Sequence, residues 1–258
     1  MRNRFGLAER LLLCGPVLAG MAGGAAAEER AGIEFALTPY IWIAGVTGTL
    51  GTKSETLPDA SVGADFGDIF SNLSAIPLML SAEIRQGRFG VIADLMAISV
   101  EADADTSGPV FSGGEARLRG AIGNVLAAWR VIETEQVRLD LGAGLRVFGL
   151  STRFTLEPGL LPGRRLERDA NWVNPILGLR YRHDLGAGWA TTIYGDIGGG
   201  GGGGGDFTWQ AMATIDYRLS DSTTLRAGYR WLSFERDSGS LSQDIGLGGP
   251  ILGATIRF

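Results

Sequence analysis

The feature that most constrains this fold is a series of segments of about ten residues in which apolar and polar side chains alternate. In the last of them, residues 248–258, Leu252, Ile256 and Phe258 share one face while Arg257 lies on the other. Because strand side chains point to opposite faces at every second residue, this alternation predicts β-strands. Lipid tolerates strands only in a closed barrel, since each unpaired backbone group there costs several kcal/mol. The pattern therefore predicts an all-β fold, a transmembrane antiparallel up-and-down β-barrel.

The connections between these segments alternate between short and long. Short ones are residues 86–88, 133–136, 186–188 and 220–223, and long ones are residues 46–74, 101–114, 151–170, 198–205 and 236–246. This asymmetry is typical of outer membrane barrels, which have short periplasmic turns and long extracellular loops. The four short turns join five hairpins into ten predicted strands: 33–44, 75–85, 88–100, 115–131, 137–150, 171–184, 189–197, 207–219, 224–235 and 248–258. Eight strands is the alternative, if one hairpin within residues 137–184 lies outside the membrane.

The first 27 residues have the pattern of a secretory signal peptide. Arginines come first, an apolar run from Leu11 to Met21 follows, and three alanines end at Ala27, where we expect cleavage. The barrel domain is then expected over residues 28–258. No later apolar run reaches the roughly 18 residues that a membrane-spanning helix requires. The only cysteine, Cys14, lies within the signal segment, so we expect a mature chain without thiols.

Charge argues against a nucleic-acid partner. The whole chain carries a formal net charge of −5, and removal of the signal segment, which carries +2, leaves −7. An acidic chain is repelled by the phosphate backbone.

The six tryptophans fall near the ends of the predicted strands. Trp129 precedes a short turn and Trp189 follows one. The other four lie near the predicted loop-side ends: Trp42, Trp172, Trp209 and Trp231. Amphipathic rings gather at both interfaces of a membrane. We therefore expect all six tryptophans to form interfacial aromatic belts.

The polar faces of the predicted strands are rich in charge and are expected to point into the lumen. In residues 137–150, for example, Arg138, Asp140 and Arg146 share the face opposite Leu141 and Leu145. A barrel of about ten strands has a narrow lumen, in which unpaired charges are costly. The sequence predicts a network of lumen ion pairs formed by Glu83, Arg85, Asp94, Arg117, Arg119, Arg138, Asp140, Arg146, Arg180, Arg182, Asp216, Arg218, Arg226 and Arg230.

This network leaves two interpretations of the lumen open. The ion pairs can plug the barrel and stabilise it. Alternatively, because arginines outnumber acids on the inner face, the lumen can be a small passage that favours anions.

Enzymatic chemistry finds little support in the sequence. The only histidine, His183, lies at a periplasmic strand end on the face predicted to contact lipid, although a serine hydrolase needs a histidine that reaches its nucleophile. Acid pairs such as Asp65 with Asp68 lie in predicted loops. The glycine run 198–205 is followed by a strand and not by the helix of a phosphate-binding loop. We therefore expect no catalytic residue, no metal site and no cofactor.

Residues 65–73 carry apolar side chains at helical spacing within the first long loop. A short amphipathic helix that folds over the barrel mouth is one interpretation. A loop that packs only on itself is the other.

Several short motifs, taken in order, resemble a family of small, largely uncharacterised outer membrane β-barrel proteins of proteobacteria. They are residues 38–42 (TPYIW), 87–95 (GRFGVIADL), 195–196 (GD), 206–210 (DFTWQ), 228–230 (GYR) and the final Phe258. The resemblance spans the mature chain and implies this fold in the cell outer membrane, with no catalytic residue carried over. Phe258 also resembles the assembly signal of outer membrane barrels, which implies the barrel assembly machinery as a partner of the last strand. The chain departs from the family in its unbroken run of eight glycines.

Together these observations predict a monomeric barrel in outer membrane lipid, with a mainly structural or surface-interaction role and a largely plugged lumen. A porin-like, anion-favouring channel for small solutes is the alternative. A surface lipid hydrolase or protease is a more distant one.

Overall fold

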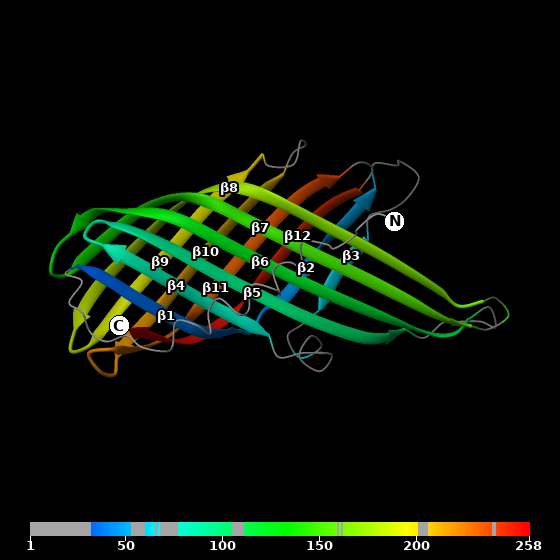
Figure 1. Ribbon diagram of the computed structural model, residues 1–258, viewed down its shortest axis with the longest axis horizontal. Coiled ribbons are helices and arrows are strands. Elements are labelled where there is room, and N and C mark those ends of the chain that lie inside the picture. Colours follow the sequence, from blue (N-terminus) through cyan, green and yellow to red (C-terminus); the bar gives the residue numbers. More distant parts are fainter. Residues whose placement is uncertain are drawn as a thin grey trace.

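The computed structural model describes residues 32–52, 60–64, 67, 77–104, 111–158, 160, 162–200, 206–238 and 241–258. The predicted signal peptide and, apart from Gly67, the predicted helix at residues 65–73 lie outside these ranges. The described strands (Figure 1) are β1 (Ile33–Trp42), β2 (Gly45–Thr52), β3 (Ala60–Ala64), β4 (Leu78–Gln86), β5 (Phe89–Ala104), β6 (Phe111–Glu133), β7 (Val137–Pro158), β8 (Arg164–Gly186), β9 (Trp189–Gly199), β10 (Phe207–Arg218), β11 (Thr223–Ser238) and β12 (Leu241–Arg257).

Ten antiparallel strands close into a barrel, as the sequence predicts. The ring runs from β1 through β4 to β12 in chain order, and β1 closes it by pairing with β12 as well as with β4. β2 continues in the direction of β1 after a break at residues 43–44 and pairs with residues 241–248 of β12. β3 runs antiparallel to β2 and pairs with it. β1 and β2 are thus two parts of one barrel strand, and the eight-stranded alternative is wrong.

The short turns lie together at one end of the barrel, on the left in Figure 1. Glycines make these turns possible where the backbone enters the left-handed region, at Gly87 with φ 55° and at Gly186 and Gly188 with φ 83°. This end faces the periplasm.

The predicted long loops are in large part strand, which corrects their boundaries. β6 and β8 have 23 residues each and β7 has 22, whereas about 10 residues suffice to cross a membrane at a tilt. At about 3.4 Å per residue such strands are roughly 75 Å long, and the hairpin of β7 and β8 reaches far beyond the barrel wall (Figure 1). Outside the membrane both strand faces can be polar, so the contrast in hydropathy that marks a strand in the sequence disappears.

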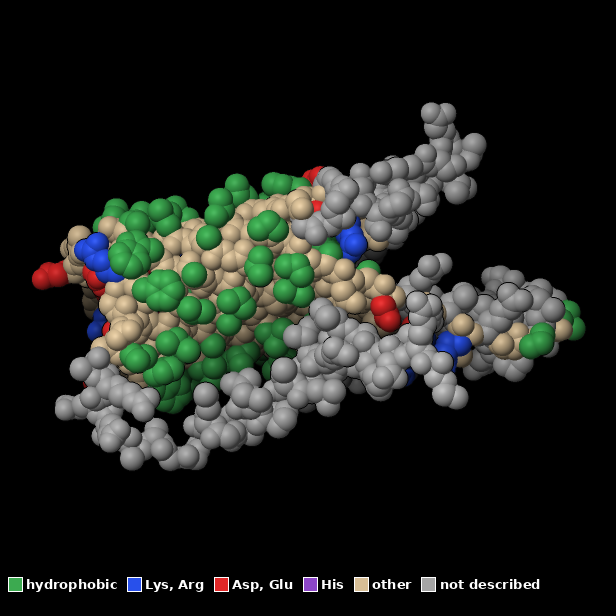
Figure 2. Space-filling model, turned by 45° about the horizontal axis from the view of Figure 1, so that its top comes forward, with side chains coloured by type: hydrophobic (Ala, Val, Ile, Leu, Met, Phe, Trp, Pro, Cys, Tyr) green, Lys and Arg blue, Asp and Glu red, His purple; other side chains and the backbone are tan. Residues whose placement is uncertain are grey.

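The outer wall of the barrel is apolar. Outward side chains in the middle of neighbouring strands remain exposed, at 53% for Val125, 51% for Leu145 and 65% for Leu177. Figure 2 shows hydrophobic side chains spread over this wall, with charged side chains toward its ends. A wall of this kind is stable only against hydrocarbon, so the barrel spans a membrane. No helix in the described ranges is long and apolar enough to cross one.

Only some of the six tryptophans face outward. Trp129, Trp189 and Trp209 are exposed by 53%, 47% and 37%, as a membrane belt requires. Trp231 also has outward parity, and its ring lies over its cross-strand partner Gly248, which lacks a side chain that would collide with the ring.

Trp42 and Trp172 do not belong to the belt, which corrects the prediction for these two residues. They are 5% and 7% exposed and lie inside the barrel. The physical reason is that the interior of the loop-side half is itself apolar. An aromatic side chain near that strand end can therefore be buried either in the lipid or inside the barrel.

Candidate functional site: the interior of the barrel

An aromatic cluster occupies the loop-side half of the lumen. The rings of Phe148 and Trp172 are stacked with centroids 4.5 Å apart, and Phe234 packs against both at 5.0 and 5.7 Å. Trp42, Met96, Leu232 and Ile251 are buried in the same cluster. Such a cluster excludes water from the section of the barrel that it occupies.

The guanidinium groups of two arginines, Arg236 and Arg230, lie over aromatic rings of this cluster. Arg236 is 4.3 Å from the centroid of the Trp172 ring, and Arg230 is 5.0 Å from that of Trp42. Cations over aromatic faces are stabilised by the ring quadrupole. The aromatic cluster is thereby joined to the polar layer below it.

Arg146 is at the centre of that polar layer. Its side chain is fully buried, and Nη2 donates to both carboxylate oxygens of Asp196 at 2.8 and 2.7 Å. Its other nitrogens donate to Asn124 Oδ1 at 2.7 Å and to Thr208 Oγ1 at 2.9 Å. Tyr194 donates its hydroxyl to the same Asp196 at 2.7 Å. Asn174, the directly opposite residue on β8, is fully buried as well, and its side-chain amide has no hydrogen-bond partner among the described residues.

Arg230 makes a second set of contacts in the same layer. Its Nη2 lies 2.9 Å from Asp94 Oδ1 and 2.7 Å from Gln210 Oε1. Its Nη1 donates to the hydroxyl of Tyr40, which in turn donates to Asp94 Oδ2 at 2.9 Å. These contacts connect β10 and β11 with β1 and β5, across the point where β1 pairs with β12.

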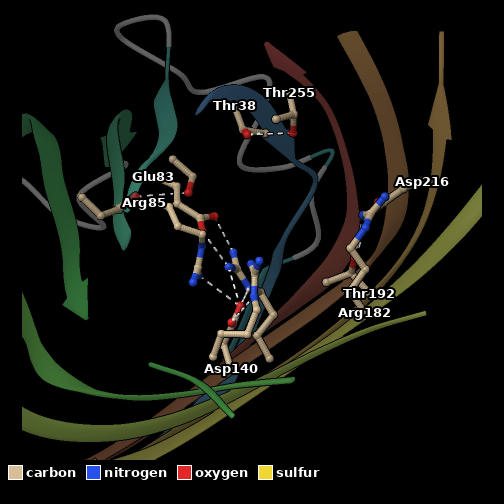
Figure 3. Close-up of polar contacts among 12 residues, drawn as sticks. Thr38, Glu83, Arg85, Asp140, Arg182, Thr192, Asp216 and Thr255 are labelled. Atoms are coloured by element: carbon tan, nitrogen blue, oxygen red, sulfur yellow. Dashed lines mark hydrogen bonds and ion pairs between the residues drawn. The ribbon is translucent and has the colours of Figure 1, made fainter. Parts of the chain in front are cut away.

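Asp140 collects three arginines nearer the periplasmic end (Figure 3). Arg85, Arg130 and Arg180 approach its carboxylate at 3.2, 3.0 and 2.8 Å. Glu83 shares two of these cations, since it lies 2.6 Å from Arg180 and 2.9 Å from Arg85. Sharing of this kind lowers the cost of burying charge, because each charge has more than one partner.

Asp216 forms the last cluster before the periplasmic mouth. It is fully buried and accepts hydrogen bonds from Thr192 at 2.8 Å and Thr214 at 2.9 Å. Arg182 contacts the same carboxylate, and Arg226 lies 3.4 Å from it (Figure 3).

Ten of the residues predicted for the network take part in these contacts: Glu83, Arg85, Asp94, Asp140, Arg146, Arg180, Arg182, Asp216, Arg226 and Arg230. Arg138 lies inside near Arg182 but makes no hydrogen bond or ion pair within the described ranges. Arg218 is at the rim, more than half exposed, and lies 3.5 Å from Asp184.

Arg117 and Arg119 do not belong to the lumen, which corrects the register predicted for β6. Buried Asn124 and Arg130 show that even-numbered residues of this strand point inward. Arg119 is exposed and has the outward parity of Trp129. The error has a physical origin, because both faces of β6 carry apolar side chains in the membrane and the sequence offers little contrast between them.

The network also contains residues that the sequence did not predict: Tyr40, Asn124, Arg130, Thr208 and Gln210. Arg130 was not predicted because the parity assigned to β6 was wrong. Thr208 and Gln210 carry no charge that would indicate a place in an ion-pair network. The motif at residues 38–42 did include Tyr40, but a tyrosine near a strand end is equally typical of a membrane belt.

The structure describes one of the candidates for enzymatic chemistry, His183. His183 has the outward parity opposite to Arg182, and its ring lies 6.2 Å from that of Tyr181. Asp65 and Asp68 lie outside the described residues. Among the residues that the structure describes, no group of three His, Cys, Asp or Glu side chains could hold a metal ion.

Comparisons with known proteins find similarity in structure alone. No family model matches the sequence, and no curated protein matches it. Similar solved structures include the outer membrane protease OmpT from Escherichia coli (9% identity, 88% of this chain and 97% of that chain, TM-score 0.46). Others are the translocator domain of the autotransporter NalP from Neisseria meningitidis (13%, 98% and 97%, 0.40) and the attachment invasion locus protein Ail of Yersinia pestis (11%, 88% and 99%, 0.37).

The molecule's own features therefore carry the assignment. Ten antiparallel strands close into a ring, the wall they form is apolar, and the charged side chains of the lumen are buried against one another. This protein is a transmembrane β-barrel of the outer membrane.

Proposed function

We propose that this protein is a closed, non-conducting barrel with a structural or surface-interaction role. The observation that supports it most is the aromatic cluster of Trp42, Phe148, Trp172 and Phe234 above the buried pair of Arg146 and Asp196. An ion that crosses the barrel would have to displace an apolar layer and then separate a fully buried ion pair. Both steps cost several kcal/mol.

The long strands support the surface part of this proposal. β6, β7 and β8 continue well beyond the length that a membrane needs, and the extension is held together by paired backbone and by contacts such as Arg153 with Glu167 at 2.8 Å. A rigid hairpin outside the membrane offers a surface to a partner, whereas a channel has no need of one.

Single-channel recording in planar bilayers tests the proposal. We expect no discrete conductance steps from the purified barrel. The double variant Phe148→Ala with Trp172→Ala removes the stacked rings and should show steps, whereas Trp129→Ala with Trp209→Ala removes two outward rings and should not. Discrete steps from the unmodified protein would overturn the proposal.

The alternative is a small passage that prefers anions, and the arginine-rich periplasmic end of the lumen supports it. Arginines outnumber acids toward the periplasmic end, where the cavity is lined by four arginines and two aspartates, among them Arg138 and Arg257. The same recordings distinguish this alternative, because its steps would show a reversal potential biased toward anions.

We also propose that the barrel is not a hydrolase. The outward parity of His183 supports this, since a histidine base must face its nucleophile. If lipid hydrolysis by the purified protein exceeds the background and is lost in His183→Ala, this proposal is wrong.

A further inference from the structure

The periplasmic mouth of the barrel contains a cavity with an excess of positive charge. It has a volume of about 210 Å³ and adjoins a second lumen cavity of about 190 Å³, with which it shares three arginines. Space of this size holds several water molecules or a small oxyanion. Its lining residues are Arg138, Arg182, Asp184, Arg218, Asp221, Thr224 and Arg257.

Two of the arginines are placed against each other. Arg138 on β7 and Arg182 on β8 are directly opposite cross-strand partners, and both have the inward parity. Like charges in this position destabilise a pair of strands. Arg138 has no hydrogen bond or ion pair among the described residues, since Glu133, its cross-strand partner on β6, is paired with Arg130 at 2.9 Å instead.

The carboxylate that pairs with Arg182 is already shared. Asp216 accepts from Thr192 and Thr214 and contacts both Arg182 and Arg226, so one negative charge faces two guanidinium groups. On the rim, Asp184 lies near Arg218 instead.

Arg257 also has donors to spare. Among the described residues its one printed side-chain hydrogen bond goes to the hydroxyl of Thr224, at 2.9 Å. Three arginines, from β7, β8 and β12, therefore line one cavity.

We propose that this cavity is a binding site for a phosphate group, held by Arg138, Arg182 and Arg257. Guanidinium groups present fixed forks of N–H donors that match phosphate oxygens, and a tetrahedral dianion can accept from several walls of a barrel at once. A carboxylate, with two oxygens in one plane, would satisfy fewer of them. The site does not depend on whether the lumen conducts.

Two sources can supply this chemistry at the periplasmic mouth, free phosphate and the headgroup of a phospholipid. Titration calorimetry of the full mature barrel in a zwitterionic detergent distinguishes them, with inorganic phosphate in one arm and a short-chain phosphatidic acid in the other. Binding in either arm supports the site and identifies its source. No heat of binding at millimolar concentrations in both arms would overturn it.

The test variant is Arg138→Gln, which removes one positive charge from the cavity. The matched control is Arg165→Gln, which removes the same charge from an exposed position at the extracellular end of β8. We expect Arg138→Gln to weaken binding by about tenfold or more and Arg165→Gln to leave it unchanged. Equal binding by Arg138→Gln would overturn the proposal, because the anion would then lie elsewhere.

A stability measurement supplies a second, independent readout. Without phosphate, Arg138→Gln should unfold at a higher temperature than the unmodified protein, because the repulsion with Arg182 is gone. Added phosphate should raise the unfolding temperature of the unmodified protein and not that of the variant. Equal stabilisation of both by phosphate would contradict the site.

Discussion

At the scale of single residues, the centre of the barrel is held by an arginine with a hydrogen bond from each of its three guanidinium nitrogens. Arg146 has no solvent exposure and bonds to three different side chains from β6, β9 and β10. A buried cation is tolerated only with such partners, because its desolvation alone costs several kcal/mol. The inner face therefore depends on geometry as strictly as an apolar core does.

Replacing this arginine should be severe. We expect Arg146→Gln to lower the free energy of unfolding by about 3–5 kcal/mol, because Asp196 is left buried without its cation. Urea titration of the barrel in lipid vesicles measures the change. The exposed pair offers the control: Arg153→Gln, next to Glu167, should cost no more than about 1 kcal/mol.

A double variant separates the pair from its surroundings. Arg146→Gln combined with Asp196→Asn should cost less than the sum of the two single changes, because neither charge is then left alone. Additive losses would show that the two side chains do not act as a pair.

At the scale of elements, the first barrel strand is divided in two. β1 ends at Trp42 and β2 begins at Gly45, and across this break Ile43 donates its backbone N–H to Pro250 O at 2.8 Å. The facing residue is Gly249, whose carbonyl accepts from Trp42 Nε1 at 3.2 Å. A methyl group at Gly249 would overlap the backbone oxygen of Ile43. The bend thus requires a residue without a side chain on β12.

Gly249→Ala should therefore destabilise the barrel by about 1–3 kcal/mol, since the strands must move apart at the bend. The matched control is Gly123→Ala on β6, because a methyl group there meets nothing within 4 Å. Unfolding of both variants in the same vesicles tests this. Equal stability of the two would contradict the close approach at Gly249.

At the scale of the whole molecule, the barrel wall contacts lipid, whereas the extracellular hairpins contact water. Exposed leucines of the wall are stable because they contact hydrocarbon. Leu145 and Leu160 are both exposed, by 51% and 77%, although the first lies in the wall and the second at the end of the β7–β8 hairpin.

An arginine at these two positions should report which leucine contacts lipid. Leu145→Arg near the middle of the wall should cost about 2–4 kcal/mol of folding free energy in vesicles. Leu160→Arg should change it by no more than about 0.5 kcal/mol. If the two substitutions cost the same, the wall does not contact lipid where the structure indicates.

The sequence by itself determined the alternation of side chains and the end at which the turns are short. In β7 the separation of Asp140 and Arg146 from Leu145 onto opposite faces follows directly from a period of two. This alternation is local, so it can be read from a stretch of about ten residues. The sequence favoured ten strands over eight, and the closed ring decided between them.

The tertiary structure alone decided which inner side chains meet and where the apolar interior begins. Arg146 and Asp196 are 50 residues apart, and only the closure and stagger of the barrel bring them together. Trp172 faces inward because Phe148 and Phe234 arrive from other strands and form an apolar layer there. Periodicity fixes the two faces of a strand, but what lies across the lumen depends on every other strand in the ring.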